Sequence, residues 1–322
     1  MTLLSPSEIF KPISFVLAAG CFLVLCPLVI LAQLVPGIPV FEIVVSYLPQ
    51  IVLLSALTAI GLGFYKPRAA TVAGAVTLVA ALPFVTFSKF QAPSKAECAP
   101  STCLTVITAN VFMRSDAMIE LGALAQQEQA DLVAINETAP RFSPQDFDTT
   151  FPEFERLRTA RSEQPYRQAS RALTLLSRKP VDHLQNITPA QAAGRSLMFA
   201  DLAGDWGGTR IVITHPLIPV SSSWTEARNT LLNVAGSTAA ASDSFILMGD
   251  FNTTPWSSTF RTLPGRRAGD PRFSATWPTF FPLLGISIDH ILASENLELV
   301  EFRVLKSVGS DHYPLLARFR RK

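Results

Sequence analysis

Three long stretches without a charged residue dominate the first ninety residues of this chain. They run from Ile13 to Val35, from Ile43 to Tyr65 and from Ala69 to Phe87. A helix needs about 20 apolar residues to cross the hydrocarbon core of a bilayer, and each stretch has that length. A cleaved signal peptide is the alternative for the first stretch, but its apolar core is too long and two further stretches follow. We therefore expect an N-terminal three-helix transmembrane region, residues 1–88, with helices at about 13–35, 43–65 and 69–87.

The few basic residues near these stretches predict how the region is oriented. Lys11 precedes the first stretch, residues 36–42 between the first two contain no Lys or Arg, and Lys66 and Arg68 lie before the third. Because short cytoplasmic loops carry the excess of Lys and Arg, the N-terminus and the second loop are expected in the cytoplasm. The chain after residue 88 is then expected on the periplasmic side of a bacterial inner membrane, as part of a multi-pass protein.

The four cysteines fit this orientation. Cys21 and Cys26 lie within the first apolar stretch, where packing is their expected role. Cys98 and Cys103 are separated by four residues that include a proline, so a disulfide between them is feasible in an oxidising compartment. Two free thiols remain the alternative. The sequence has no Cys/His cluster of the kind that binds zinc.

Residues beyond the apolar region are long enough for one sizeable domain. Residues 89–103 are expected to form a linker, and residues 104–322 the domain. Of the 27 Lys and Arg residues and 25 Asp and Glu residues of the chain, only Lys11, Lys66, Arg68, Glu8 and Glu42 precede residue 89. The domain is therefore nearly neutral, which argues against a protein that follows long DNA through its phosphate backbone.

The pattern of apolar residues in this domain predicts alternating strands and helices. Strands are expected at residues 104–110, 131–135, 172–176, 196–202, 210–214, 244–248, 288–292, 297–304 and 315–319, and helices at 115–129 and 223–235. Ser115 is expected to cap the first helix. Strands outnumber helices, so the fold class is mixed α/β.

Polar residues suited to metal or proton chemistry follow several of these strands. They are Asn110, Glu137, His215, Asp250 with Asn252, and Asp311 with His312, whereas Asp289 lies at the start of a strand. Polar groups at the strand ends of an α/β domain commonly meet at one edge, where loops form a cleft. His183, in an expected polar loop, and His290, which should point away from Asp289, are not expected to take part.

Seven segments in this order resemble the endonuclease/exonuclease/phosphatase superfamily, whose members include deoxyribonuclease I. The segments are Thr108–Asn110, Ile135–Glu137, Leu175–Arg178, Ile213–His215, Gly249–Asn252, Ile288–His290 and Ser310–His312. With the leading apolar stretches, they resemble a bacterial membrane-anchored branch. Many members have Gln where this chain has Asn136. The resemblance implies a four-layer α/β-sandwich for residues 104–322.

The resemblance and ligand chemistry together indicate the site residues. Hard divalent cations prefer carboxylate oxygen, so Glu137 and Asp311 are the expected ligands of Mg²⁺ or Mn²⁺. Asn110 would bind the metal directly or through water, or hold the phosphate.

Catalytic roles are expected for five further residues, although which of them is acid and which is base stays open. Asp250 would orient or deprotonate the attacking water, and Asn252 would hold that water or a phosphoryl oxygen. His312, oriented by Asp289, would stabilise charge on the phosphate or act as acid or base. His215 is the candidate acid for the leaving oxygen.

These residues predict a membrane-anchored, Mg²⁺-dependent phosphoesterase in which water attacks phosphorus in line. The substrate is either a nucleic acid, with Arg161, Arg167, Arg171, Arg178 and Arg195 as possible phosphate contacts, or a lipid-linked phosphate such as undecaprenyl pyrophosphate. Tethering to a bilayer favours the lipid. An inactive membrane-bound binding module is the third hypothesis, which the full set of site residues disfavours. No protein partner is expected.

Overall fold

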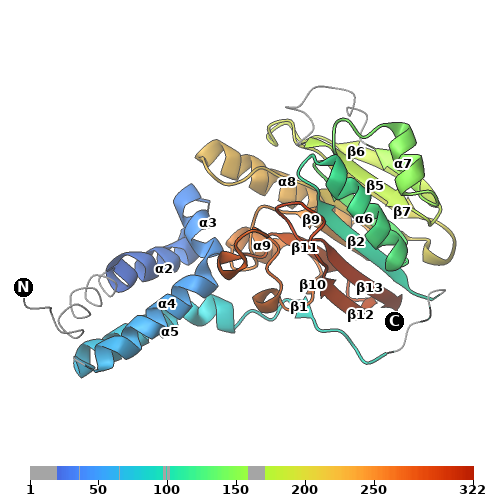
Figure 1. Ribbon diagram of the computed structural model, residues 1–322. Coiled ribbons are helices and arrows are strands. Elements are labelled where there is room, and N and C mark those ends of the chain that lie inside the picture. Colours follow the sequence, from blue (N-terminus) through green and yellow to red (C-terminus); the bar gives the residue numbers. More distant parts are fainter. Residues whose placement is uncertain (1–19, 36, 65, 97–98, 100–101, 159–170) are drawn as a thin grey trace, which may run out of the picture. The chain divides into compact units, whose positions relative to one another are not determined.

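The computed structural model describes residues 20–35, 37–64, 66–96, 99, 102–158 and 171–322. The chain divides into two compact units (Figure 1). A helical unit contains the residues up to Ser88 together with Pro255–Ser258. A sheet unit contains Lys89–Thr254 and Thr259–Lys322.

The helical unit is a series of apolar helices that start at prolines. After the π-helix η1 (Cys21–Leu25) come α2 (Cys26–Leu34), α3 (Pro39–Ser46), α4 (Leu48–Gly63) and α5 (Pro67–Val85). Each of the four α-helices has a proline at its first or second position. Proline lacks an N–H but has a helical φ, so it is accepted at a helix start. Pro83 lies inside α5, two residues before its end.

This placement of prolines bears on the expected membrane spans. Among the described residues, α5 alone is long and apolar enough by itself to cross a membrane. The α2–α3 pair passes the same test only as a pair bent by 119°, and α4 has 16 residues. The second expected span is divided between α3 and α4, and part of the first, residues 13–19, lies outside the described residues. The structure therefore does not confirm three spans.

The segment Pro255–Ser258 is held inside the helical unit by polar and aromatic contacts. Ser257 Oγ donates to the buried Glu42 carboxylate at 3.0 Å. The ring of Trp256 packs against Phe84 and Phe87, with centroid distances of 5.1 and 5.7 Å. Pro255–Ser258 therefore packs with residues that lie far from it in sequence.

The sheet unit is a sandwich of two sheets. The six-stranded sheet has the order β12-β13-β2-β3-β5-β4, and the seven-stranded sheet β1-β10-β11-β9-β8-β7-β6. The first sheet consists of β2 (Leu104–Asn110), β3 (Leu132–Asn136), β4 (Glu155–Arg158), β5 (Leu173–Ser177), β12 (Leu297–Val304) and β13 (Leu315–Arg321). The second consists of β1 (Phe90–Gln91), β6 (Val181–Ile187), β7 (Leu197–Leu202), β8 (Thr209–Thr214), β9 (Ser244–Asp250), β10 (Arg266–Ala268) and β11 (Asp289–Ala293).

Apolar side chains from both sheets meet in one core. Val106 and Leu315 from the six-stranded sheet and Ile211, Ile246 and Ile291 from the seven-stranded sheet belong to the same buried cluster. These central strands are buried on both faces, which explains their nearly continuous apolar sequences.

Helices cover the outer faces of the two sheets. The helices α6 (Ser115–Gln127) and α7 (Pro144–Thr150) share a second buried cluster with β2, β3 and β13. On the seven-stranded sheet, α8 (Ser222–Ala240) packs on β8 and β9. Short helices, α9 (Ser258–Thr262), η3 (Gly204–Trp206), η4 (Pro271–Phe273) and η5 (Pro282–Leu284), lie in the connections. The order of layers is helix, sheet, sheet, helix, and the sequence-based expectation of a mixed α/β sandwich is confirmed (Figure 1).

Some local expectations differ from the structure. His183 lies on β6 and not in a loop, because β6 is an exposed edge strand that lacks an apolar pattern. Ser115 is the first residue of α6 and does not cap it, since the preceding Arg114 occupies the N-cap position. The segment expected as a linker contains β1, which pairs with β10. Cys103 is disulfide-bonded, and Cys98, its expected partner, lies outside the described residues.

Candidate active site

Strand register brings the polar strand ends of both sheets to one edge of the sandwich. In the six-stranded sheet, Asn110 at the end of β2 lies opposite Asn136 at the end of the parallel strand β3. In the seven-stranded sheet, Asp250 at the end of β9 lies opposite Asp289 at the start of the antiparallel strand β11. Asp289 therefore joins the strand-end residues although it begins its own strand, because β11 runs in the reverse direction.

Asn136 connects the two sheets at this edge. Its side-chain oxygen accepts from the backbone N–H of Asp250 at 2.9 Å, and its side-chain nitrogen donates to the carbonyl of Thr214 at 3.4 Å. Asn136 is fully buried. One side chain on β3 thus satisfies backbone groups of β9 and β8, a role that sequence reasoning missed because it is visible only across the sandwich.

The glycine before Asp250 is explained by close packing at the same point. Gly249 has φ of +139°, and a Cβ atom there would lie 2.1 Å from the carbonyl oxygen of Thr214. Only glycine can take this backbone conformation without displacing β8. The Gly-Asp-Phe-Asn motif therefore begins with a residue that lets the chain pass close to Thr214 and then presents Asp250.

Asp250 is the centre of the polar cluster. Its Oδ2 accepts from Asn110 Nδ2 at 3.1 Å and lies 3.4 Å from His215 Nε2 and 3.9 Å from His312 Nε2. Burial opposes ionisation of this carboxyl, but the hydrogen bond from His215 and the charge on His312 hold its pKa below its ordinary value. Asp250 is therefore ionised at neutral pH and accepts hydrogen bonds.

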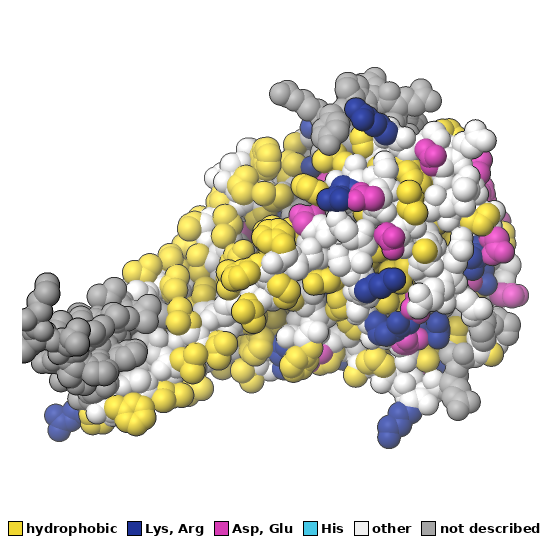
Figure 2. Space-filling view, in the orientation of Figure 1, with side chains coloured by type: hydrophobic (Ala, Val, Ile, Leu, Met, Phe, Trp, Pro, Cys, Tyr) yellow, Lys and Arg dark blue, Asp and Glu magenta, His cyan; other side chains and the backbone are white. Residues whose placement is uncertain are grey.

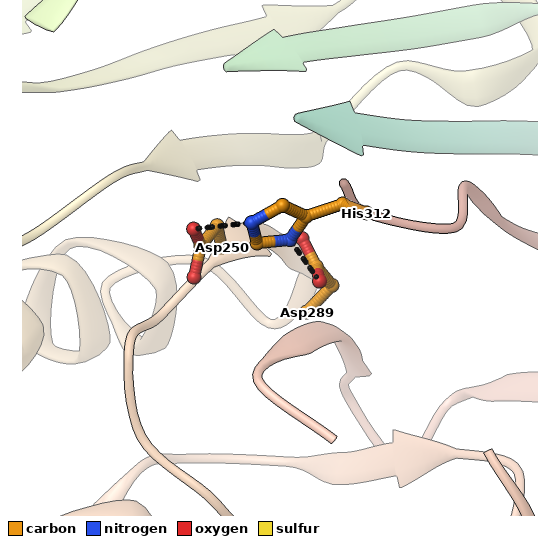
Figure 3. A group of neighbouring side chains, drawn as sticks. All are labelled: Asp250, Asp289 and His312. Carbon is orange, nitrogen blue, oxygen red and sulfur yellow. Dashed lines mark hydrogen bonds and ion pairs between the residues drawn. The ribbon is translucent and has the colours of Figure 1, made fainter. Parts of the chain in front are cut away.

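His312 forms a buried ion pair with Asp289 (Figure 3). The distance from His312 Nδ1 to Asp289 Oδ2 is 2.8 Å, and the other ring nitrogen faces Asp250. Burial lowers the pKa of His312, yet Asp289, followed by Asp250 and Asp311, raises it to about 10. Burial also raises the pKa of Asp289. The His312–Asp289 pair therefore retains one proton up to high pH. The carboxylates of Asp289, Asp250 and Asp311 favour that proton on the imidazole of His312.

The motif that carries His312 is fixed to the end of β2. Ser310 Oγ donates to the carbonyl of Asn110 at 2.7 Å and accepts from the backbone N–H of His312 at 3.2 Å. The first residue of the Ser-Asp-His motif thus places the third beside Asp250.

His215 has a defined tautomer. Arg195 NH1 lies 3.2 Å from His215 Nδ1. A guanidinium can only donate, so Nδ1 accepts and the ring proton is on Nε2. That N–H faces Asp250 Oδ2 at 3.4 Å and Glu137 Oε1 at 3.6 Å. Burial lowers the pKa of Arg195 to about 10, while Glu137 counteracts the shift, so Arg195 stays charged at neutral pH.

Asn252 is held by contacts from three directions. Its backbone N–H donates to Asp250 Oδ1 at 2.9 Å, and its side-chain nitrogen donates to the carbonyl of Pro216 at 3.1 Å. The buried Arg228 of α8 donates to its carbonyl at 3.3 Å. Its φ of +47° is unusual for a residue other than glycine, and asparagine tolerates it better than most residues. The side-chain oxygen is directed away from Pro216.

The expected metal ligands, Glu137, Asp311 and Asn110, also lie at this edge. Glu137 follows β3 with φ of +52°, and burial raises the pKa of its carboxyl. Asp311 Oδ1 lies 4.0 Å from His312 Nε2, and its Oδ2 accepts from Trp277 Nε1 at 3.0 Å. Asn110 Oδ1 accepts a hydrogen bond from the N–H of Phe112 at 3.0 Å. The second lone pair of this oxygen could bind a metal or a water.

The donor set and the charge balance fit a hard divalent cation. Glu137, Asp250, Asp289 and Asp311 supply four carboxylates, against the positive charges of His312 and Arg195. A cation near Glu137 would offset the cost of burying its charge. A second compact group, Asp250, Asp289 and His312, has ligand atoms within 4.8 Å of one another. To bind a metal, His312 of this group would first have to lose the proton that Asp289 stabilises.

The remaining candidates lie apart from this cluster or carry structural contacts. His290 is buried, accepts from Arg267 Nε at 2.9 Å and donates to the carbonyl of Thr253 at 2.9 Å, so it supports the loop after Asn252. Arg178 pairs with Glu153. Arg161 and Arg167 lie outside the described residues. Arg195 alone of the five arginines named from the sequence has a described contact with a site residue.

The chain matches one family model and many solved structures. A model of the Endonuclease/Exonuclease/phosphatase family matches residues 107–312. A humanized zebrafish (D. rerio) TDP2 is similar over 68% of this chain and 99% of its own, with 15% identity and a TM-score of 0.56. A 3′ phosphatase from Neisseria, NExo, bound to a product DNA hairpin, is similar over 67% of this chain and 99% of its own, with 17% identity and a TM-score of 0.53.

The human Nocturnin catalytic domain is similar over 69% of this chain and 94% of its own, with 15% identity and a TM-score of 0.53. Comparison with curated proteins found no match. At these identities the solved structures establish the fold of the sheet unit.

Proposed function

This chain belongs to the Endonuclease/Exonuclease/phosphatase family, and from that membership we propose that it hydrolyses a phosphate ester by direct attack of water on phosphorus, with the help of Mg²⁺. The family and its fold are those of phosphoester hydrolases. The observation that carries the proposed mechanism is the position of Asp250, an ionised carboxylate in contact with Asn110, His215 and His312.

Asp250 and Asn252 act on the attacking water in this mechanism. Asp250 orients the water by accepting a hydrogen bond from it, because the lowered pKa of Asp250 keeps the carboxylate ionised. The side-chain oxygen of Asn252, turned away from Pro216, holds the same water or the ester. No covalent enzyme intermediate is required.

The two histidines act on developing negative charge. His312, kept protonated by Asp289, donates from Nε2 to a phosphoryl oxygen. His215 presents Nε2–H to the same region and is the candidate donor to the leaving oxygen, with its tautomer set by Arg195. Glu137, Asp311 and Asn110 would hold a bound Mg²⁺ or Mn²⁺, which would neutralise charge on the phosphoryl and leaving oxygens.

The helical unit is proposed to tether the enzyme to a bacterial inner membrane. The length and composition of α5, the bent apolar pair α2–α3 and the many exposed large apolar side chains of these helices support the tether. The disulfide of Cys103 supports a periplasmic location for the sheet unit, since disulfides persist in oxidising compartments.

The substrate class is proposed as either a nucleic acid or a lipid-linked phosphate such as undecaprenyl pyrophosphate. DNA was bound to the Neisseria phosphatase and to a zebrafish TDP2 in solved structures. The membrane tether favours the lipid in this chain.

The test uses the full chain purified in detergent. We expect hydrolysis of bis(p-nitrophenyl) phosphate with Mg²⁺ or Mn²⁺, and no hydrolysis in EDTA. Asp250→Asn and His312→Gln should each lower kcat by a factor of about 10²–10⁴, the usual contribution of a positioned acid or base. Asp182→Asn, an exposed carboxylate on β6, is the matched control and should retain wild-type turnover. Near-normal turnover of either site variant contradicts the mechanism.

A panel of plasmid DNA and a polyprenyl pyrophosphate then separates the two substrate classes. DNA cleavage alone identifies a nuclease, and release of inorganic phosphate from the lipid identifies a lipid phosphatase. If the folded, metal-loaded protein hydrolyses none of the substrates, the result would favour a binding module.

A further inference from the structure

Exposed apolar side chains are concentrated on loops that are bonded to the candidate active site. We call them the apolar rim. It consists of Phe112, Ile218, Val220, Trp224, Phe280, Phe281, Leu283 and Leu284. All belong to the sheet unit, and their exposed fractions range from 43% for Trp224 to 86% for Leu283. Single exposed apolar residues are normal on a protein surface, but a group beside a site indicates a binding surface.

The most exposed part of the rim is the loop from Thr279 to Leu284. Its base is fixed to the Ser-Asp-His motif: the N–H of Thr279 donates to the carbonyl of Asp311 at 2.9 Å, and its hydroxyl donates to the carbonyl of Ser310 at 2.9 Å. Beyond this base, Phe280 is 77% exposed. The loop is thus held next to the site while its apolar side chains face solvent.

Two other parts of the rim are also bonded to site residues. The backbone N–H of Phe112 donates to Asn110 Oδ1 at 3.0 Å. Asn252 Nδ2 donates to the carbonyl of Pro216 at 3.1 Å, and the segment after Pro216 carries Ile218, Val220 and, at the start of α8, Trp224. Three separate loops of the rim are therefore hydrogen-bonded to residues of the candidate active site.

The two longer loops of the rim contain no charged residue. Neither Pro216–Trp224 nor Phe273–Ile288 includes Asp, Glu, Lys or Arg. Figure 2 shows groups of hydrophobic side chains exposed on one face of the molecule. A nucleic acid partner would require Lys or Arg for its phosphates, so an uncharged aromatic surface fits an apolar partner better.

We propose that the apolar rim docks into the surface of a lipid bilayer, so that the site acts on phosphate esters held at that surface. The proposal rests on the membrane tether inferred above. The helix α5 ends at Val85 and β1 of the sheet unit begins at Phe90. Only four residues separate α5 from β1 along the chain.

The composition of the rim suits the interface region of a bilayer. Phenylalanine and leucine side chains partition into the acyl boundary, and tryptophan is enriched at the level of the head groups. A docked rim would bring Asp250 and His312 to lipid phosphates. The substrate class that follows is a phosphate ester in a lipid, since a soluble ester would gain nothing from the rim.

Trp224 provides a direct probe of docking. The full chain is reconstituted into vesicles of phosphatidylcholine and phosphatidylglycerol, prepared with or without bromine on the acyl chains. Bromine quenches a tryptophan that enters the bilayer. The emission of Trp224 is obtained as the difference between wild type and Trp224→Phe, which removes the contributions of Trp206, Trp256 and Trp277. We expect the Trp224 emission to be quenched in brominated vesicles.

Two variants test whether the quenching comes from docking of the rim. Phe280→Ser combined with Leu283→Ser should lose the quenching of Trp224. Leu184→Ser, an exposed leucine on the edge strand β6, is the matched control and should keep it. Both substitutions replace exposed residues, and circular dichroism verifies that each variant is folded.

The outcomes separate the proposals. Protein that floats with vesicles but shows no quenching of Trp224, or equal quenching in the double variant, overturns docking and leaves the tether intact. Protein that does not float with vesicles overturns both the tether and docking. Hydrolysis of bis(p-nitrophenyl) phosphate, measured separately, tests the proposed chemistry independently of either result.

Discussion

Replacing Asp289 by asparagine should release the proton that His312 holds at neutral pH. Asp289 Oδ2 lies 2.8 Å from His312 Nδ1, whereas the carboxylates of Asp250 and Asp311 lie 3.9 and 4.0 Å from Nε2. Asparagine keeps the size of the side chain and can still accept a hydrogen bond, but it carries no charge. The substitution therefore removes the closest negative charge and leaves the burial of His312 unchanged.

The magnitude follows from the pKa of His312. Burial opposes protonation, yet the carboxylates raise the pKa from 6.5 to about 10, which corresponds to roughly 5 kcal/mol in favour of the charged form. Asp289 makes the only hydrogen bond to the ring among the described residues. We therefore expect Asp289→Asn to lower the pKa by at least about two units, or roughly 3 kcal/mol.

The same shift predicts how stability depends on pH. A group whose pKa is raised on folding stabilises the folded state fully below its unfolded pKa, and that stabilisation is lost as pH rises through its folded pKa. The contribution of His312 is thus complete below pH 6.5 and is lost as pH approaches about 10. Asp289→Asn should lose most of this dependence between those two values.

The assay is an NMR titration of the imidazole Cε1–H signals in EDTA, so that no bound metal competes with the proton. The chain has four histidines, and the spectrum of His312→Gln identifies the signal of His312. Asp182→Asn is the matched control and should leave that signal unchanged. The reasoning is refuted if His312 in Asp289→Asn titrates within one unit of its wild-type pKa.

Three further substitutions test other contacts of the site. Asn136→Ala should lower the free energy of unfolding by about 1–3 kcal/mol in urea denaturation, because the buried N–H of Asp250 loses its acceptor; an unchanged midpoint would contradict this link between the sheets. Gly249→Ala should cost more, above about 2 kcal/mol, since its Cβ would lie 2.1 Å from the Thr214 carbonyl, and a melting temperature equal to wild type would refute the steric argument. Glu137→Gln should bind Mg²⁺ more weakly, as measured by calorimetry. In EDTA it should be at least as stable as wild type, because burial raises the pKa of Glu137 and so disfavours its charged form. A loss of stability in EDTA would contradict this, since it would show that other groups compensate the charge of Glu137 without a metal.

Much of the fold was readable from periodicity. The strands β2, β3, β5, β7, β8, β9, β11, β12 and β13 and the helices α6 and α8 lie where apolar patterns predicted them, to within a few residues except at the C-terminal end of α8. The edge strand β6 was missed, because a strand whose residues are almost all exposed has no apolar pattern to detect. The three expected spans were read from the length of uncharged stretches, with the prolines inside them taken as tolerated. In the structure α4 begins at Leu48, next to Pro49, so the second stretch is divided between two helices.

Part of the candidate site could also be predicted from the pattern of apolar strands. Asn110, Glu137, Asp250 and His312 could be named because each follows an apolar strand, and the order of the motifs indicated the family. Asn136 was passed over as a variation within a motif, although it bonds the two sheets together.

The sequence by itself determined which chemical groups the chain carries, where its strands end, and that a long apolar region precedes them, because these depend on neighbours along the chain. The tertiary structure decided the charge of His312, the tautomer of His215 and the exposure of the apolar rim. Those properties arise from burial and from distances between residues far apart in sequence, such as Asp289 beside His312 and Arg195 beside His215. Electrostatic interaction and burial both depend on distances in space, so only the packed sandwich determines these three properties.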